Sequence, residues 1–180
     1  MEYHSGDCYV GDWLQSPPIM TSAVKPNGRG IMTFANGDKY TGLFESGQRH
    51  GQGVMTSASG AYDGAWVDGK RSGEGTWQTK GGKYSGTWVN DQRSGHGLMR
   101  YDHGDRVYQG HWEAGLPAGQ GTYWYDSSED GGRRTYVGEV KGVMHAGLPW
   151  PQPHGQGTMW AADGSQEVVG RWADGAKVPV

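Results

Sequence analysis

The sequence is poor in the residues that usually fill a globular core. Leu, Ile, Val and Phe together account for 22 of the 180 residues, about 12%. A share below about 20% is typical of disordered chains when the net charge is also large. Here the formal net charge is only −3, and nine Trp and ten Tyr carry apolar surface on their rings. The composition therefore excludes a core of aliphatic side chains and favours one built from aromatic rings.

Other absences narrow the class of protein further. The lone Cys8 cannot form an internal disulfide, which fits a reducing, cytoplasmic location. No apolar run approaches the roughly 20 residues of a membrane span, so neither a span nor a signal peptide is predicted. The near-neutral charge lacks the basic surface that nucleic-acid binding usually needs, so no nucleic-acid partner is expected.

What the sequence has in excess is glycine, 34 residues in all, and the glycines are periodic. The motif Tyr40-x-Gly42-x-Phe44 recurs at 22- to 24-residue spacing where no insertion intervenes. A Gly-x-Gly pair follows each central copy, as at Gly51 and Gly53, and a large apolar side chain such as Met55 lies two residues further on. Further copies of the first motif begin at Tyr9, Tyr62, Tyr84, Tyr108, Tyr136 and Val168.

One unit of this pattern predicts a β-hairpin. The alternation of ring, glycine and ring has the period of a strand, and the polar run over 45–50 with its central glycine is typical of a turn. Glycines on the ring-bearing face leave bare backbone on which a neighbouring ring can lie. The sequence therefore predicts an all-β fold: an elongated, single-layer, twisted antiparallel sheet of tandem hairpins.

The pattern closely resembles the MORN repeat (membrane occupation and recognition nexus) from about Tyr9 to Trp172. The resemblance implies a non-catalytic scaffold that takes a helical or extended partner segment along its concave face. It also implies roles in cytoskeletal structures, including cilia, flagella and their axonemes. Two alternatives stay open: an adaptor for phosphoinositides or acidic membranes, and a module that recruits a separate enzyme.

The repeats predict a domain organisation with irregular ends. Residues 1–8 form a half-hairpin, six hairpin repeats cover 9–167 with starts near 9, 40, 62, 84, 108 and 136, and 168–180 form a partial repeat. Insertions fall at 14–27, 126–135 and 141–154. Two of them are proline-rich and are predicted to be loops, with Pro17, Pro18 and Trp150 as candidate contacts. The unfinished ends are expected either to be protected by partners or self-association, or to be continued by further chain.

The aromatic row has two interpretations that can hold together. Each ring can pack on the glycines of its neighbour, or part of the row can line an open groove, because a contiguous exposed aromatic surface usually binds a partner. The candidate groove residues are Tyr40, Phe44, Tyr62, Trp66, Trp77, Tyr84, Trp88, Tyr108, Trp112 and Tyr123.

Cations recur where the predicted turns end, at Arg49, Lys70, Arg71 and Arg93. The resemblance suggests acidic phospholipid as their ligand, although each would add only about 1 kcal/mol at an anionic surface. The simpler interpretation is a solvated turn. No phosphate-binding loop, zinc-binding signature or nucleophile motif accompanies them, so no cofactor, metal or catalytic residue is predicted.

Overall fold

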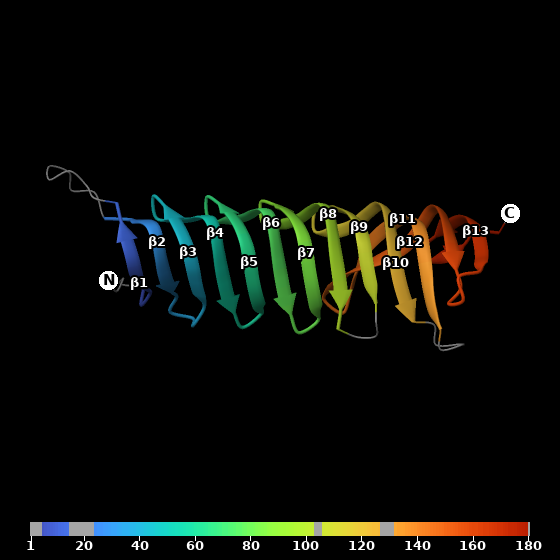
Figure 1. The fold of residues 1–180 in the computed structure, drawn as a ribbon, viewed down its shortest axis with the longest axis horizontal. Coiled ribbons are helices and arrows are strands. Elements are labelled where there is room, and N and C mark those ends of the chain that lie inside the picture. Colours follow the sequence, from blue (N-terminus) through green and yellow to red (C-terminus); the bar gives the residue numbers. More distant parts are fainter. Residues whose placement is uncertain (1–4, 15–23, 103–105, 127–131, 180) are drawn as a thin grey trace. The chain divides into compact units, whose positions relative to one another are not determined.

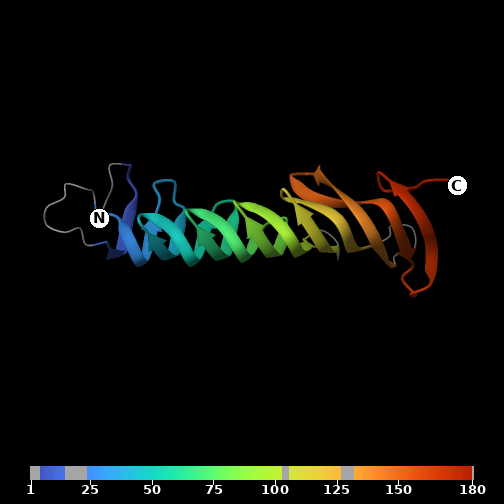
Figure 2. The same cartoon turned by 90° about the horizontal axis from the view of Figure 1, so that it is seen from above.

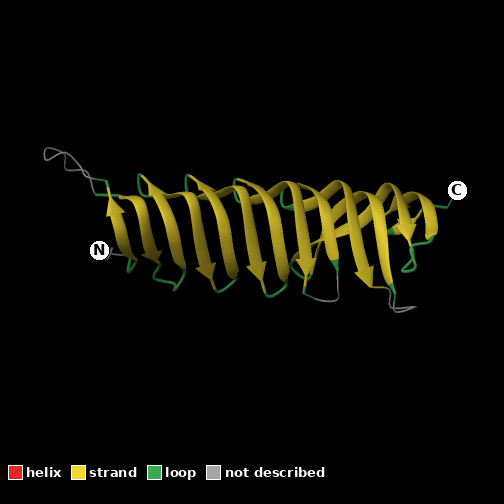
Figure 3. Ribbon diagram, viewed as in Figure 1, coloured by secondary structure: helices red, strands yellow, loops and turns green. Residues whose placement is uncertain are grey.

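The computed structural model describes residues 5–14, 24–102, 106–126 and 132–179, which form fourteen β-strands and no helix (Figure 3). All strands belong to one antiparallel sheet whose spatial order follows the chain (Figure 1). The strands are β1 (Cys8–Trp13), β2 (Pro26–Thr33), β3 (Lys39–Glu45), β4 (Gln48–Ser57), β5 (Gly60–Val67), β6 (Lys70–Thr79), β7 (Gly82–Val89), β8 (Gln92–Tyr101), β9 (Val107–Glu113), β10 (Leu116–Asp126), β11 (Arg133–His145), β12 (Leu148–Trp160), β13 (Gln166–Ala173) and β14 (Ala176–Lys177). The predicted all-β fold of successive hairpins is confirmed.

The described residues divide into two compact units. Unit 1 comprises 1–79 and 89–91, and unit 2 comprises 80–88 and 92–180, apart from the residues outside the described ranges. Within each unit we call the sheet face that carries the repeat tyrosines the inner face, and the opposite face the outer face. Because both units are built from the same repeat, equivalent positions can be compared between them.

Tight turns close the hairpins at one end. Both residues of each turn have positive φ, for example Ser46 at 51° and Gly47 at 89°, which is the type I′ geometry that suits the twist of paired strands. Five turns end in glycine, whereas Asp91 occupies this place in the sixth with φ 70°. The turns are 46–47, 68–69, 90–91, 114–115, 146–147 and 174–175.

Paired glycines run across the sheet in the middle of the strands. In unit 1, Gly42 lies opposite Gly30 on one side and opposite Gly53 on the other. A methyl group at Gly53 would overlap the hydroxyl end of the Tyr40 ring, so only glycine leaves room for that ring. The same row continues through Gly11, Gly64 and Gly75 in unit 1, and comprises Gly86, Gly97, Gly110, Gly121, Gly138, Gly157 and Gly170 in unit 2.

Each repeat tyrosine lies flat over this glycine row and is fixed at its hydroxyl. The Tyr40 hydroxyl donates to the carbonyl oxygen of Leu43 at 2.9 Å, three residues along its own strand. Because Tyr40 is fully buried, this hydrogen bond satisfies a polar group that would otherwise destabilise the core. The same bond is made by Tyr9, Tyr62, Tyr84, Tyr108 and Tyr136.

Trp and Phe side chains wedge edge-on between successive tyrosines. The Trp66 ring is 5.3 Å from the Tyr40 ring and 5.1 Å from the Tyr62 ring, both nearly perpendicular. Its indole N–H donates to the carbonyl oxygen of Gly53 in the preceding repeat at 3.1 Å. Trp112 and Trp172 repeat this bond in unit 2. The core is therefore a single row of interlocked rings rather than a layer between two sheets.

The second strand of each hairpin bends at the first glycine of its Gly-x-Gly pair. Gly51 has φ 60°, and the β3–β4 register shifts beside it, from Gly42 opposite Gly53 to Leu43 opposite His50. An irregularity of this kind bends a strand and increases its twist. The bend wraps the strand around the ring row, which explains how one sheet buries its own aromatic side chains.

The prediction that 141–154 contains a proline-rich loop is wrong. These residues lengthen β11 and β12 into one long hairpin around the Ala146–Gly147 turn, with Val143 opposite Trp150. Pro149, Pro151 and Pro153 fall on alternate residues, so their missing N–H groups all lie on the side away from β11. That side has no partner strand in the described structure, because β12 pairs with β13 only from Gly155 onward.

The other insertion residues are largely outside the described ranges. Pro17 and Pro18 lie within 15–23, and much of the 126–135 insertion lies within 127–131. The contacts predicted for the two prolines therefore stay predictions. At the N-terminal end, residues 5–7 precede β1 without strand structure.

Gly53→Ala should test the space that the tyrosine ring requires. We expect a loss of about 3 kcal/mol in the free energy of unfolding, because the methyl group overpacks the Tyr40 hydroxyl. Gly37→Ala is the matched control, since its φ of 86° is strained for alanine but the space around it is open, giving about 1 kcal/mol. Urea unfolding followed by Trp fluorescence measures both, and equal losses would contradict the packing described.

Alkaline pH should unfold the ring row. Burial raises the pKa of Tyr40, Tyr62 and Tyr136 from 10.0 to about 12, so the folded state holds these protons more tightly than the unfolded chain. Their contribution to stability is complete below pH 10 and is lost as pH rises toward 12. Circular dichroism and tyrosinate absorbance should change together in that window. Full tyrosinate absorbance near pH 10 with intact β-structure would be inconsistent with burial.

Candidate partner-binding groove

Nine of the ten aromatic side chains proposed for the groove lie in the core. Trp77 is the exception and is half-buried. Their burial follows from the strand bend and the edge-to-face packing, which cover rings that a flat single-layer sheet would expose. Whether a partner contacts these rings stays a prediction. The nine buried residues are Tyr40, Phe44, Tyr62, Trp66, Tyr84, Trp88, Tyr108, Trp112 and Tyr123.

In unit 1 the accessible part of the inner face lies beside the buried rings. Met32 and Met55 flank Tyr40 in the strand register, and both are half-buried. Together with Phe34 and Arg49 they line an open hollow of about 380 Å³. Its floor is apolar and polarisable, with thioether and ring surfaces that adapt to different ligand shapes.

In unit 2 the equivalent surface is covered by the chain itself. The end of the β11–β12 hairpin, orange in Figures 1 and 2, lies over the inner face, where Trp150 contacts Tyr101 and Tyr123 at ring distances of 4.8 Å and 5.8 Å. The Tyr101 hydroxyl donates to the carbonyl oxygen of Pro149 at 2.6 Å. Burial raises the pKa of Tyr101 well above its usual value. Trp150, predicted as a surface-loop contact, is therefore an internal one.

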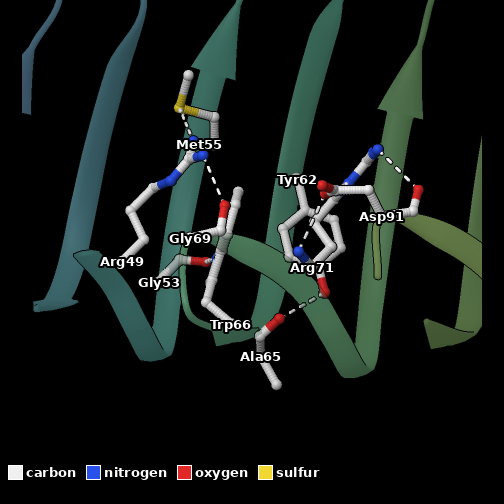
Figure 4. A network of polar contacts seen from close by, with 9 residues as sticks. All are labelled: Arg49, Gly53, Met55, Tyr62, Ala65, Trp66, Gly69, Arg71 and Asp91. Atoms are coloured by element: carbon white, nitrogen blue, oxygen red, sulfur yellow. Dashed lines mark hydrogen bonds and ion pairs between the residues drawn. The ribbon is translucent and has the colours of Figure 1, made fainter. Parts of the chain in front are cut away.

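The arginines after the turns are held by the next repeat (Figure 4). The Arg49 guanidinium lies 4.4 Å from the Trp66 ring centroid and donates to the carbonyl oxygen of Gly69 at 2.7 Å. Burial lowers the pKa of Arg49 below its usual value. Arg93 makes the equivalent contacts in unit 2, with the Trp112 ring at 5.1 Å and the Gly115 carbonyl oxygen at 3.1 Å.

Arg71 lies against a ring of its own strand and has an acidic partner in the next repeat. Its guanidinium lies 5.4 Å from the Trp77 ring and donates to the Asp91 carboxylate at 3.0 Å (Figure 4). The Asp91 carboxylate also accepts the backbone N–H of Arg71, which helps to hold aspartate in a turn position that usually needs glycine. Of the four predicted lipid-binding cations, three are thus packed against rings, and Lys70 alone is exposed. Lipid binding by these residues stays a prediction.

Other chemistry on the described residues is sparse. Among them, no group of three or more His, Cys, Asp or Glu side chains is placed to hold a metal ion. No described segment forms a helix of the length and apolar character that could cross a membrane. On the outer face, His96 and His111 meet edge to face at 5.7 Å, and Val10 is 66% exposed.

The sequence motif did not single out Phe34 or Tyr101. Each lies two residues beyond the Met of the motif, where other repeats have small side chains such as Ser57 and Thr79. The alternation of side chains in an extended segment could have identified these residues, because Met32 and Phe34 are two residues apart and so fall on one face. An aromatic residue at this position marks where the inner face extends beyond the repeat core.

A comparison with protein-family models shows what the repeats are similar to. The MORN repeat model matches residues 25–39, 40–61, 62–83, 84–106, 108–129 and 152–166, about two thirds of the chain. Four of these matches begin at the motif tyrosines Tyr40, Tyr62, Tyr84 and Tyr108. No curated protein matches the chain at a significant level.

Arg49→Gln should show whether the turn cations are structural. We expect a loss of about 1–2 kcal/mol in the free energy of unfolding, since the change removes the stacking on Trp66 and a charged hydrogen bond to Gly69. Lys70→Gln is the control and should change stability by less than about 0.5 kcal/mol, because Lys70 is exposed. Thermal or urea unfolding distinguishes them, and similar small effects would argue against a structural role for Arg49.

Proposed function

Because this chain belongs to the MORN repeat family, we propose that it is a non-catalytic scaffold that binds a segment of a partner protein along the inner face of unit 1. The binding is by surface complementarity, with apolar side chains of the hollow burying part of the partner. The partner segment is extended or helical. In this proposal the chain belongs to the cytoplasm, within a cytoskeletal, ciliary or flagellar assembly.

The open hollow of unit 1 is the observation that carries this proposal. Met32, Phe34 and Met55 present apolar surface to solvent in a depression of about 380 Å³, within the range of pockets that bind small groups. Burying such a surface against a partner would stabilise a complex by roughly 25 cal/mol per Å² before the costs of association. The equivalent surface in unit 2 is occupied by the chain's own hairpin, so the repeat surface is suited to contact with a peptide segment.

The cytoskeletal placement is supported by family resemblance. Repeats of this kind occur in radial-spoke and other axonemal proteins, and they match about two thirds of this chain. The membrane-adaptor alternative is less favoured, because three of the four candidate cations lie against rings and donate to turn carbonyls.

Crosslinking in the native cell tests the proposal. A tagged chain should be recovered in the cytoskeletal fraction with a small set of crosslinked neighbours. Phe34→Asp should remove the neighbours that use the hollow, because it places a charge on the apolar floor. Val10→Asp is the matched control on the exposed outer face of the same unit and should retain them.

Two results would contradict the proposal. One is an identical set of neighbours for both variants, since the hollow would then be irrelevant to binding. The other is tight binding to anionic vesicles at about 150 mM salt that is lost when Arg49, Lys70, Arg71 and Arg93 are neutralised together. That second result would favour the membrane adaptor. Circular dichroism of each purified variant establishes that it is folded.

A further inference from the structure

Trp150 fills a defined seat in unit 2. Its ring packs between Tyr101 and Tyr123, and the Arg106 guanidinium lies 5.0 Å from its ring centroid. Met99 and Tyr101, on the strand beneath, are only 2% and 6% exposed. The backbone around Trp150 is extended and is held by the hydrogen bond from the Tyr101 hydroxyl to the Pro149 carbonyl.

The hollow of unit 1 stands at the equivalent place in the repeat. Met32 faces Tyr40 across the strands as Met99 faces Tyr108, and Phe34 and Tyr101 each lie two residues further along. The position of Tyr123 is taken by Met55. The side chains that line the hollow are therefore large and apolar like those that surround Trp150. In unit 1 they enclose open space.

The charge beside the seat is reversed between the units. Arg106, which covers Trp150, lies two residues before its repeat tyrosine, and Asp38 lies two residues before Tyr40. The Asp38 carboxylate accepts an amide hydrogen bond from Asn36 at 3.0 Å, and no cation of the described chain pairs with it. Arg49, on the opposite wall, is already engaged by Trp66 and Gly69. The two walls therefore carry opposite charges: the Arg49 guanidinium is packed on a ring, and the Asp38 carboxylate is the group left to pair with a partner's cation.

We propose that the hollow of unit 1 is a seat for one large aromatic side chain, borne on an extended segment of a partner protein with a Lys or Arg beside it. This inference rests on the proposed function and specifies the partner's chemistry. The aromatic ring lies between Phe34 and Met55 as Trp150 lies between Tyr101 and Tyr123. The partner's cation pairs with Asp38. It takes the role that Arg106 has beside Trp150 in unit 2.

The probe is a ten-residue peptide with the sequence of residues 145–154, dye-labelled at its N-terminus, and carrying Gln152→Arg. Residues 150 and 152 of an extended segment share a face, so the Arg stands beside the Trp. Fluorescence anisotropy with the full chain gives the affinity. A peptide with Trp150→Ala should bind at least about tenfold more weakly, as expected when an anchor residue is truncated. A peptide that carries Gln152→Glu instead of Gln152→Arg should bind about fivefold more weakly. This is the difference expected when an exposed charge pair is lost.

Variants of the chain locate the site. Asp38→Lys should reverse the preference between the Arg and Glu peptides, whereas Asp63→Lys, the same charge change on the exposed outer face, should leave it unaltered. Met32→Lys should abolish binding by filling the hollow. Asp38 is half-exposed and precedes β3, and Asp63 is exposed on β5, so their variants keep the test valid even if Met32→Lys unfolds.

Each contrary outcome is informative. Equal affinity for the Trp and Ala peptides, with binding still lost in Met32→Lys, would overturn the aromatic seat and leave the scaffold proposal standing. Retained binding in Met32→Lys would place the peptide elsewhere, for instance in exchange with Trp150 in unit 2, and would also overturn the seat. No peptide binding together with no Phe34-dependent neighbours in the cell would reject both proposals.

Discussion

Everything in this structure depends on one contact, a tyrosine ring lying flat on two glycines. The ring of Tyr40 covers the paired glycines Gly42 and Gly53, and its hydroxyl bonds to the carbonyl of Leu43. The contact joins neighbouring strands, fills the space above bare backbone and satisfies a buried polar group at once. Its repetition allows a chain with few aliphatic residues to bury a core. The Trp and Phe wedges then connect one tyrosine to the next, so each repeat depends on its neighbours.

The arginines after the turns belong to the same design. The Arg49 and Arg93 guanidinium groups each cover a Trp ring of the adjacent repeat, whereas Arg71 lies against Trp77 of its own strand. All three donate to a carbonyl oxygen in the turn of the adjacent repeat. Planar guanidinium groups suit this dual role because they stack on rings while donating in their own plane. In this fold the recurrent cation at a turn therefore links one hairpin to the next. The sequence pattern alone suggested a solvated side chain or a lipid-binding one.

The sequence predicted the hairpins, the ring row and the role of the glycines, because these follow from the period of two and from the absence of a side chain. It left open whether the rings pack on neighbouring glycines or line a groove, because the bend at Gly51 that covers them depends on a backbone conformation that the pattern does not encode. The fate of 141–154 was also missed. Proline suggested a loop, whereas prolines at alternate positions are compatible with a strand that has one unpaired edge. The hollow of unit 1 could not be predicted from the sequence, because the repeat pattern does not show which part of the inner face stays uncovered.

The alternate prolines of β12 also bear on how this protein behaves in concentrated solution. A long hairpin that extends beyond its neighbours offers a row of backbone donors on which a strand from another molecule could pair. Pro149, Pro151 and Pro153 remove those donors along the overhang, while Leu148, Trp150 and Gln152 keep theirs for β11. The side chains of Pro149 and Pro151 are also fully buried, and the Pro149 carbonyl oxygen is occupied by the Tyr101 hydroxyl, so this edge is covered as well as poor in donors. It therefore offers no template on which a strand of another molecule could pair.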